Sequence, residues 1–267
     1  MSSSPQGPGD GSPRVAIVTG ATKGIGAALA WRFAEDGVKV VLTDLETSAA
    51  GIAAEIAKAH PGSEAVGLQT DVTDPAACDA LVATAVERHG RLDVLAVATA
   101  VAAKRSFLKD LDPAEWDRVM TVNAKGPFLL SRSAIPALTA PGGSIVYVYS
   151  ATAQAGVPER AVYSASKGAL GSMIKSLALE LAPDRITVNG VAPWHVEAPM
   201  NTAALEAIAA ETGITVEEAR ARRSAAIPLG RQATAREIAD AMAYLASPQA
   251  AYVTGTILDI NGGVLLR

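Results

Sequence analysis

Cysteine and histidine are scarce in this sequence, with one cysteine and three histidines in 267 residues. The single thiol of Cys78 can form neither an intrachain disulfide nor a cysteine-based metal cluster. His60, His89 and His195 are not spaced as metal ligands are, and we expect each of them on the surface or in a loop. The sequence therefore predicts no metal site.

Long apolar runs and an excess of basic residues are also absent. The apolar run at 94–103 is interrupted at Thr99 and is far shorter than a membrane span. We find no apolar signal segment ahead of residue 14. The formal net charge of −4 argues against a nucleic-acid-binding surface. We therefore expect a cytoplasmic protein with neither nucleic acid nor membrane as a partner.

The chain does contain a regular alternation of short apolar runs and helical patterns. Residues 1–13 are rich in Ser, Pro and Gly, and we expect them to form a disordered tail. Helical patterns occupy 47–59, 75–88, a long region up to 138, a stretch from Tyr163 to Leu181, and 235–246. Seven apolar runs alternate with the helical patterns, at 15–18, 39–42, 65–69, 93–98, 144–149, 185–191 and 256–260.

Runs that are apolar throughout are typical of parallel strands buried on both faces. Their alternation with helices predicts a Rossmann-type, doubly wound parallel α/β sheet of about seven strands with helices on both faces. We find no repeat and no second boundary, so residues 14–267 are expected to form one domain. Residues 193–229 follow a strand's carboxyl end, where such sheets bind ligands, and are expected to form the substrate loop.

A glycine-rich turn connects the first predicted strand to the first helix. Glycines let the backbone approach a ligand closely, and the free N–H groups of a helix N-terminus attract a pyrophosphate. A plain turn is the simpler interpretation, but the position in a βαβ unit favours dinucleotide binding. A Walker loop is excluded because Lys23 precedes Gly24 and no Gly-Lys-Ser/Thr is present. The residues expected to hold the dinucleotide here are Gly20, Thr22, Lys23, Gly24, Ile25 and Gly26.

The choice between NAD and NADP depends on Asp44 and Lys23. Asp44 lies just past the second predicted strand, where a carboxylate accepts the ribose hydroxyls of NAD and repels the 2′-phosphate of NADP. Lys23 acts in the opposite direction, since a cation near the ribose could hold that phosphate. We favour NAD because opposing like charges is costly in a desolvated site.

Tyr163 and Lys167 are four residues apart and share one face if this stretch is helical. A phenol has a pKa of about 10, and a fixed neighbouring positive charge lowers it by favouring the phenolate. The pair could therefore act as an acid–base catalyst. The pattern alone is weak evidence, because tyrosine and lysine often occur at helical spacing.

Taken together, these motifs resemble a short-chain dehydrogenase/reductase of the single-domain type, and the resemblance covers residue 14 to the C-terminus. The glycine turn, Asp44 and the Tyr163/Lys167 pair are joined by further motifs in the family's order and spacing. These are Asp71-Val72, Asn123, Ser150, Tyr252-Val253-Thr254-Gly255 and Asp259-Ile260-Asn261-Gly262-Gly263.

The resemblance implies a role for each residue of the catalytic set. Tyr163 would be the general acid or base, and Lys167 would lower its pKa and hold the nicotinamide ribose. Ser150 would hydrogen-bond the substrate oxygen, and Asn123 would hold a water that links Lys167 to solvent. Taken singly, each has an ordinary structural explanation; together at this spacing they indicate catalysis.

The resemblance also implies cofactor contacts and self-association. Asp71 and Val72 would contact the adenine, and Ala98, Pro193 and Val196 would line the cofactor site. Members of the family commonly form homotetramers, so we expect a homo-oligomer.

The chain departs from the family in one neighbourhood. Val97-Ala98-Thr99-Ala100 stands where the family usually has Asn-Asn-Ala-Gly, and the usual threonine near the carboxamide falls at Ala198. Trp194 replaces the glycine of the usual Pro-Gly after the sixth strand, and Tyr149 stands beside Ser150 where a small residue is frequent. We interpret Tyr149 and Trp194 as substrate-pocket residues that fit a flat or bulky substrate; neutral variation is the alternative.

The leading hypothesis is an NAD(H)-dependent oxidoreductase that interconverts a secondary alcohol and a ketone. The first alternative keeps the fold and the catalytic residues but uses NADPH, as a ketoreductase that tailors a natural product. The second is a nucleotide-binding regulator without turnover, which the altered segment at 97–100 favours and the intact catalytic set opposes.

Overall fold

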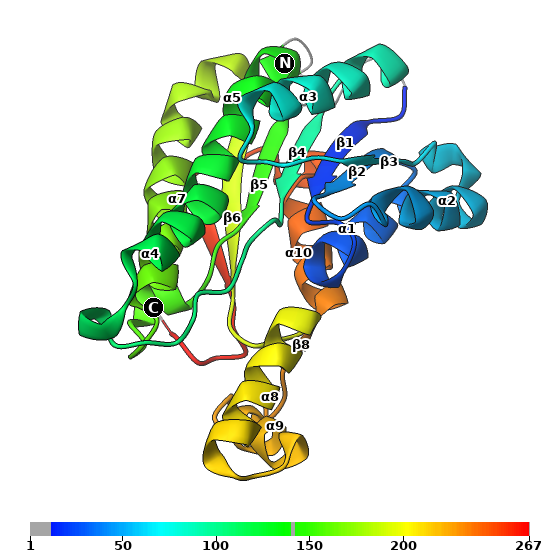
Figure 1. The fold of residues 1–267 in the computed structure, drawn as a ribbon. Helices are drawn as coiled ribbons and strands as arrows, with labels where there is room; N and C mark the ends of the chain where they lie inside the picture. Colours follow the sequence, from blue (N-terminus) through cyan, green and yellow to red (C-terminus); the bar gives the residue numbers. More distant parts are fainter. Residues whose placement is uncertain (1–11, 140–141, 267) are drawn as a thin grey trace.

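The structure is a computed structural model that describes residues 12–139 and 142–266. Except for two exposed residues, the expected tail at 1–13 lies outside this part of the chain. Seven parallel strands form the central sheet in the order β3-β2-β1-β4-β5-β6-β9 (Figure 1). The predicted Rossmann-type doubly wound sheet is confirmed. The strands are β1 (Val15–Thr19), β2 (Lys39–Asp44), β3 (Val66–Gln69), β4 (Val94–Val97), β5 (Ser144–Val148), β6 (Thr187–Pro193) and β9 (Ile257–Ile260).

Helices cover both faces of the sheet (Figure 1). α1 (Gly24–Glu35), α2 (Ala49–Ala59) and α10 (Ala235–Leu245) bury apolar side chains on one face. α3 (Pro75–His89), α5 (Gly126–Thr139) and α7 (Ala161–Glu180) do so on the other. β1, β4 and β5 are buried along their whole length, as their uniformly apolar sequences predict.

The long helical region expected up to residue 138 is interrupted. α4 (Pro113–Met120) and α5 are joined by a π-helical turn at Thr121–Lys125, which contains the fully buried Asn123. The Asn123 Oδ1 accepts a hydrogen bond from the Val101 N–H at 2.8 Å, and its Nδ2 donates to the Val101 carbonyl at 3.0 Å. The π turn therefore ties this helix pair to the loop that follows β4.

Residues beyond β6 form a separate projection at the carboxyl end of the sheet. α8 (Pro199–Thr212) and α9 (Val216–Ala225) extend below the strands in Figure 1, and we call residues 199–225 the lid. β7 (Val196–Glu197) and β8 (Ala233–Thr234) pair in parallel and join the two ends of this segment. The sequence marked this region as the substrate loop but did not predict its division into two helices.

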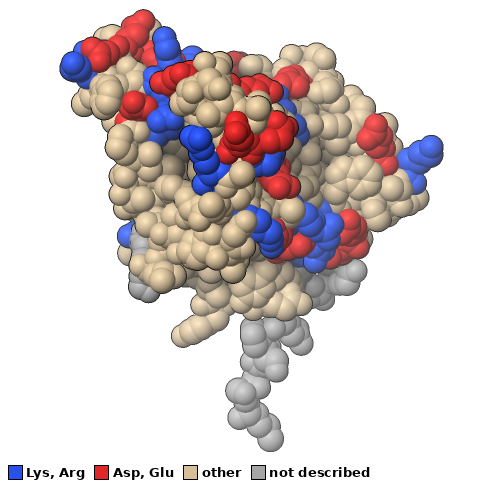
Figure 2. All heavy atoms as spheres, turned by 90° about the horizontal axis from the view of Figure 1, so that it is seen from below, with Lys and Arg blue, Asp and Glu red and all other residues tan. Residues whose placement is uncertain are grey.

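On the face that carries the lid, basic and acidic side chains are interspersed (Figure 2). Among the helices that the structure describes, none is long and apolar enough to cross a membrane.

Candidate active site

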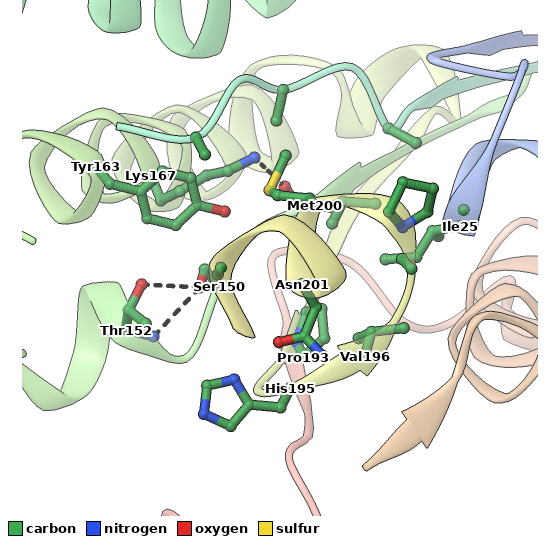
Figure 3. A pocket seen from close by; sticks show the side chains of 18 of the residues that line it. Ile25, Ser150, Thr152, Tyr163, Lys167, Pro193, His195, Val196, Met200 and Asn201 are labelled. Atoms are coloured by element: carbon green, nitrogen blue, oxygen red, sulfur yellow. Dashed lines mark hydrogen bonds between the residues drawn. The ribbon is translucent and has the colours of Figure 1, made fainter. Parts of the chain in front are cut away.

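A cavity of about 460 Å³ opens at the carboxyl ends of the strands, between the sheet and the lid (Figure 3). Its walls come from the β1–α1 turn, the segments after β4 and β5, the N-terminal half of α7, the end of β6 and the lid. Ligands bind at this edge of open α/β sheets. The cavity brings together Tyr163, Lys167 and Ser150 with the glycine turn.

Ser150 follows β5 and is 6% exposed. Its hydroxyl shares a hydrogen bond of 2.8 Å with the Thr152 Oγ1 and accepts one from the Thr152 N–H at 3.3 Å. Thr152 begins α6 (Thr152–Ala155), so this short helix fixes the Ser150 side chain at the cavity wall (Figure 3). The hydroxyl also acts on the Tyr163 phenol, whose pKa it lowers.

Tyr163 and Lys167 lie one turn apart on α7, as their spacing predicts. The Lys167 ammonium donates to the Val148 carbonyl at 2.8 Å and lies 5.9 Å from the centroid of the Tyr163 ring. Burial lowers the pKa of Lys167 to about 8.

Burial raises the pKa of Tyr163, and the Ser150 hydroxyl and the Arg160 charge oppose that rise. Desolvation outweighs these two opposing effects. That Lys167 lowers the pKa of this phenol stays a prediction.

Asn123 lies behind this group and not on the cavity wall. Besides the two bonds to Val101, its Nδ2 donates to the Ser166 Oγ at 3.2 Å. Ser166 is fully buried on α7, between Tyr163 and Lys167 in sequence. Asn123 thus connects the loop after β4 to the helix that carries the catalytic pair, while its water-holding role stays a prediction.

The glycine turn packs closely against its own backbone and against the segment after β4. A Cβ on Gly26 would lie 2.2 Å from the Gly20 carbonyl oxygen, and one on Gly20 would lie 2.8 Å from the Thr99 nitrogen. Gly20 and Gly24 also have positive φ, which glycine adopts without strain. α1 begins after Lys23 with no side-chain cap, so N–H groups of its first turn are left for a ligand beside the cavity. The turn fits the pyrophosphate of a dinucleotide.

Asp44 ends β2 and lines the cavity next to this turn. Its Oδ2 accepts hydrogen bonds from the Thr22 hydroxyl at 2.6 Å and the Thr22 N–H at 3.2 Å. The Lys23 ammonium pairs with Glu46 at 2.5 Å. The cation that could hold a 2′-phosphate therefore already has a carboxylate partner, and the pair is exposed to solvent.

The remaining expected cofactor residues divide into two groups. Ile25, Ala98, Pro193 and Val196 line the cavity, as expected for cofactor contacts. Asp71 and Val72 do not. The Asp71 carboxylate accepts hydrogen bonds from the N–H and hydroxyl of Thr73, and Val72 is buried. Their adenine contact stays a prediction.

Tyr149 and Trp194, the two aromatic residues that differ from the family pattern, are buried to different degrees. The Tyr149 ring is buried in a small cluster with Leu170 and Ala192, and a Cβ on Gly171 would lie 3.0 Å from its Cε2. Trp194 packs against this cluster, lines the cavity and lies 5.3 Å from the His195 ring, centroid to centroid. Both residues line the cavity, and Tyr149 is the more buried of the two.

The structure corrects the expectation for one histidine. His89 is not on the surface, because its side chain is fully buried at the end of α3. His195 lies in a connection, as expected, but it lines the cavity. Burial and the charges of Arg223 and Arg160 lower its pKa to about 4, so its imidazole is neutral near pH 7. Among the described residues, no group of three or more His, Cys, Asp or Glu could hold a metal ion.

Sequence reasoning missed the arginines of the cavity. Arg105 follows β4, Arg160 precedes α7 and Arg223 belongs to α9, and all three line the same cavity. The position of Arg160, three residues before Tyr163, could have indicated a shared face. No sequence signal distinguishes Arg223 from its neighbours Arg220 and Arg222.

A comparison with protein families matches residues 20–265 to the family model described as enoyl-(acyl carrier protein) reductase. A cis-4-hydroxycyclohexanecarboxylate dehydrogenase from Sinomonas cyclohexanicum is 38% identical over 251 residues, which cover 94% of this chain and 96% of the relative. The chain belongs to the short-chain dehydrogenase/reductase family. It is therefore an oxidoreductase that interconverts alcohol and carbonyl groups with a nicotinamide cofactor.

Solved structures of this family with different cofactors superpose on the enzyme. A 3-ketoacyl-(acyl-carrier-protein) reductase from Brucella melitensis with NADH has a TM-score of 0.84 at 33% identity, covering 95% of this chain and 98% of that one. A variant of actinorhodin polyketide ketoreductase with NADPH has a TM-score of 0.87 at 35% identity, covering 94% and 97%. The shared fold is thus compatible with either cofactor.

Proposed function

We propose that this short-chain dehydrogenase/reductase interconverts a cyclic secondary alcohol and its ketone, with Tyr163 as general acid and base. The observation that carries the proposal is the convergence of Tyr163, Ser150 and Lys167 on one cavity beside the glycine turn. The relatives named for hydroxycyclohexanecarboxylate and polyketide substrates support a ring-shaped substrate. When bound, the nicotinamide supplies or takes up the hydride.

The protein's own residues manage the proton and the developing charge. In reduction, the Tyr163 phenol donates its proton to the carbonyl oxygen, and in oxidation it accepts the alcohol proton. The Ser150 hydroxyl donates a hydrogen bond to the same oxygen and stabilises charge there. Lys167, held against the Val148 carbonyl, places a cation beside the ring when protonated.

The proposal is tested by following nicotinamide absorbance with a panel of cyclic alcohols and ketones, including 4-hydroxycyclohexanecarboxylate and 4-oxocyclohexanecarboxylate. Tyr163→Phe should lower kcat by about 100- to 10,000-fold, because general acid–base catalysis contributes that much. Dinucleotide affinity should change little. An unchanged rate in Tyr163→Phe would favour the non-catalytic regulator.

We propose NAD(H) as the preferred cofactor. The support comes from two carboxylates at the end of β2, Asp44 and Glu46, together with the engagement of Lys23 by Glu46. A 2′-phosphate in this place would face Asp44 and would have to displace Glu46 from Lys23. The NADPH-dependent ketoreductase of natural products is the competing function, since one structural relative binds NADPH.

Titration with NADH and NADPH distinguishes these two functions. We expect tighter NADH binding, and we expect Asp44→Ser to reduce that preference at least about tenfold by removing the repulsive charge. Asp117→Ser is the control, because Asp117 is exposed on α4 and lies outside the cavity lining. Tighter NADPH binding by the unchanged enzyme would contradict the proposal.

A further inference from the structure

The substrate side of the cavity carries three arginines from three separate elements. Arg105, Arg160 and Arg223 all line it, and His195 lies among them with a neutral ring. Of the described residues that line the cavity, Asp44 is the sole carboxylate, and it belongs to the dinucleotide end. The outer face around the lid carries both basic and acidic side chains (Figure 2). The excess of positive charge is therefore a feature of the cavity and not of the surrounding surface.

Arg160 and Arg223 have neutral partners. The Arg223 Nη1 donates to the Asn201 Oδ1 at 2.5 Å, and the Arg160 Nη1 donates to the Ala103 carbonyl at 3.3 Å. Neither forms a salt bridge within the described part of the chain, whereas Arg105 pairs with Glu159 at 2.8 Å. Both guanidinium groups keep further N–H donors for a ligand.

These charges also disfavour one another. Burial lowers the pKa of Arg160 and of Arg223, and neighbouring arginines lower them further, while Glu159 partly opposes this shift at Arg160. Half-buried like charges that outnumber their one nearby carboxylate raise the energy of the site, and an anion between them would offset that cost. A guanidinium is the side chain best suited to a carboxylate, which it holds with two parallel hydrogen bonds.

The position of the cluster relative to Tyr163 restricts the kind of anion. Arg160 precedes Tyr163 by three residues and its charge acts on the phenol, so the two lie on one side of the cavity. Asn201, which holds Arg223, is drawn near Ser150 and His195 in Figure 3, and Ile25 lies across the cavity. Trp194, Val157 and Ile208 supply apolar wall between them.

We propose that Arg160 and Arg223, with Arg105 beside them, form a subsite for the carboxylate of a cyclic hydroxy or keto acid. This inference rests on the proposed function, because the reacting carbon is placed at Tyr163 and Ser150. The substrate class is thus an acid with an apolar ring between its carboxylate and its carbinol or carbonyl carbon.

Calorimetric titration of the enzyme with saturating NADH tests the subsite, because the dinucleotide then covers the first turn of α1. The probes are cyclohexanecarboxylate and the isosteric cyclohexanecarboxamide. We expect the carboxylate to bind about 10- to 100-fold more tightly, the range that charge-assisted hydrogen bonds provide. Arg160→Met and Arg223→Met should each remove most of this preference, and Arg223→Lys should retain part of it.

Arg222→Met is the matched control, since Arg222 is exposed on the same helix and lies outside the cavity lining. It should keep the full preference for the carboxylate. Equal binding of the two probes by the unchanged enzyme, or an equal loss in Arg222→Met and Arg223→Met, would overturn the subsite. Circular dichroism of each variant separates loss of binding from loss of fold.

The same experiments separate this inference from the proposed function. Tyr163-dependent reduction of cyclohexanone without a carboxylate preference would remove the subsite and leave the oxidoreductase. A carboxylate preference that Arg223→Met removes, in an enzyme that Tyr163→Phe does not impair, would leave the subsite and remove the proposed chemistry.

Discussion

The burial of Lys167 makes the stability of the protein depend on pH. Burial lowers its pKa from 10.5 to about 8, so between these values the folded protein binds fewer protons than the unfolded chain. The free energy of unfolding therefore rises with pH in this window, as the cost of burying the ammonium is relieved. From pH 8 to 9.5 we expect a gain of roughly 1.5 kcal/mol over a Lys167→Met variant.

Urea denaturation of both proteins across that window measures the difference. The window ends at pH 9.5 because Tyr163, whose pKa is raised, contributes with the opposite sign at higher pH. Lys175→Met, at an exposed position on the same helix, should follow the unchanged enzyme. If the free energy of unfolding changed equally with pH in Lys167→Met and the unchanged enzyme, the buried lysine would not be the source of the pH dependence.

Trp194 is the second residue with a direct expectation, because it forms cavity wall where the family usually has glycine. Trp194→Gly should raise KM for cyclic ketones at least about tenfold through lost apolar contact, while KM for NADH changes little. Steady-state kinetics measure both constants. Trp116→Ala, at a partly exposed tryptophan outside the cavity lining, is the control. Unchanged substrate and NADH constants in Trp194→Gly would favour neutral variation.

Among the elements, the π turn at Thr121–Lys125 connects the most distant parts of the site. Asn123→Ala leaves the partly buried N–H and carbonyl of Val101 without their partners. We expect a loss of about 2–4 kcal/mol in the free energy of unfolding, since each unsatisfied group costs about 1–3 kcal/mol. Denaturant titration measures it, and kcat should fall as well because Ser166 loses its bond to Asn123.

Thr234→Ala is the control variant for Asn123→Ala. It removes the side-chain cap at the start of α10, far from this turn, and should cost about 0.5–2 kcal/mol with kcat unchanged. If Asn123→Ala lost no more stability than Thr234→Ala and kept its kcat, the π turn would not act as the connector described.

Elements defined by local pattern were predicted closely, and those set by tertiary contacts were not. The helix expected at 75–88 is Pro75–His89, and that expected at 235–246 is Ala235–Leu245. The π turn had no local signal, and the bonds from Asn123 to Val101 that accompany it join residues 22 positions apart in sequence.

In the candidate site too, residues with a local sequence signal were predicted and residues brought together only by the fold were not. The glycine turn, Asp44 and the Tyr163/Lys167 pair carry local spacing signals and meet where the fold predicts. The arginine cluster does not, because Arg105, Arg160 and Arg223 become neighbours only when three elements fold together.

For the whole molecule, we expect self-association through the open edge of the sheet. β9 is the last strand of the sheet, and Leu258 on it and Leu179 on the neighbouring helix α7 are 38% and 81% exposed. Because members of this family commonly form homo-oligomers, we expect a second copy of the chain to cover this edge. Analytical ultracentrifugation should show a dimer or tetramer, and a Leu179→Lys/Leu258→Lys double variant should sediment as a smaller species.

Leu45→Lys is the control for this prediction, since Leu45 is 62% exposed just past β2, toward the opposite edge of the sheet. It should leave the sedimentation coefficient unchanged. A monomer for the unchanged enzyme would contradict the expectation directly.

The pairing of β7 with β8 makes the lid a segment that could be exchanged as a unit. Because adjacent strands lie about 4.8 Å apart, this pairing holds both ends of residues 198–232 together at one place on the scaffold. The segment between them can change in length or sequence without altering the path of the chain through the sheet. A lid exchanged with that of a relative should therefore transfer substrate selectivity while the rest of the protein folds as before.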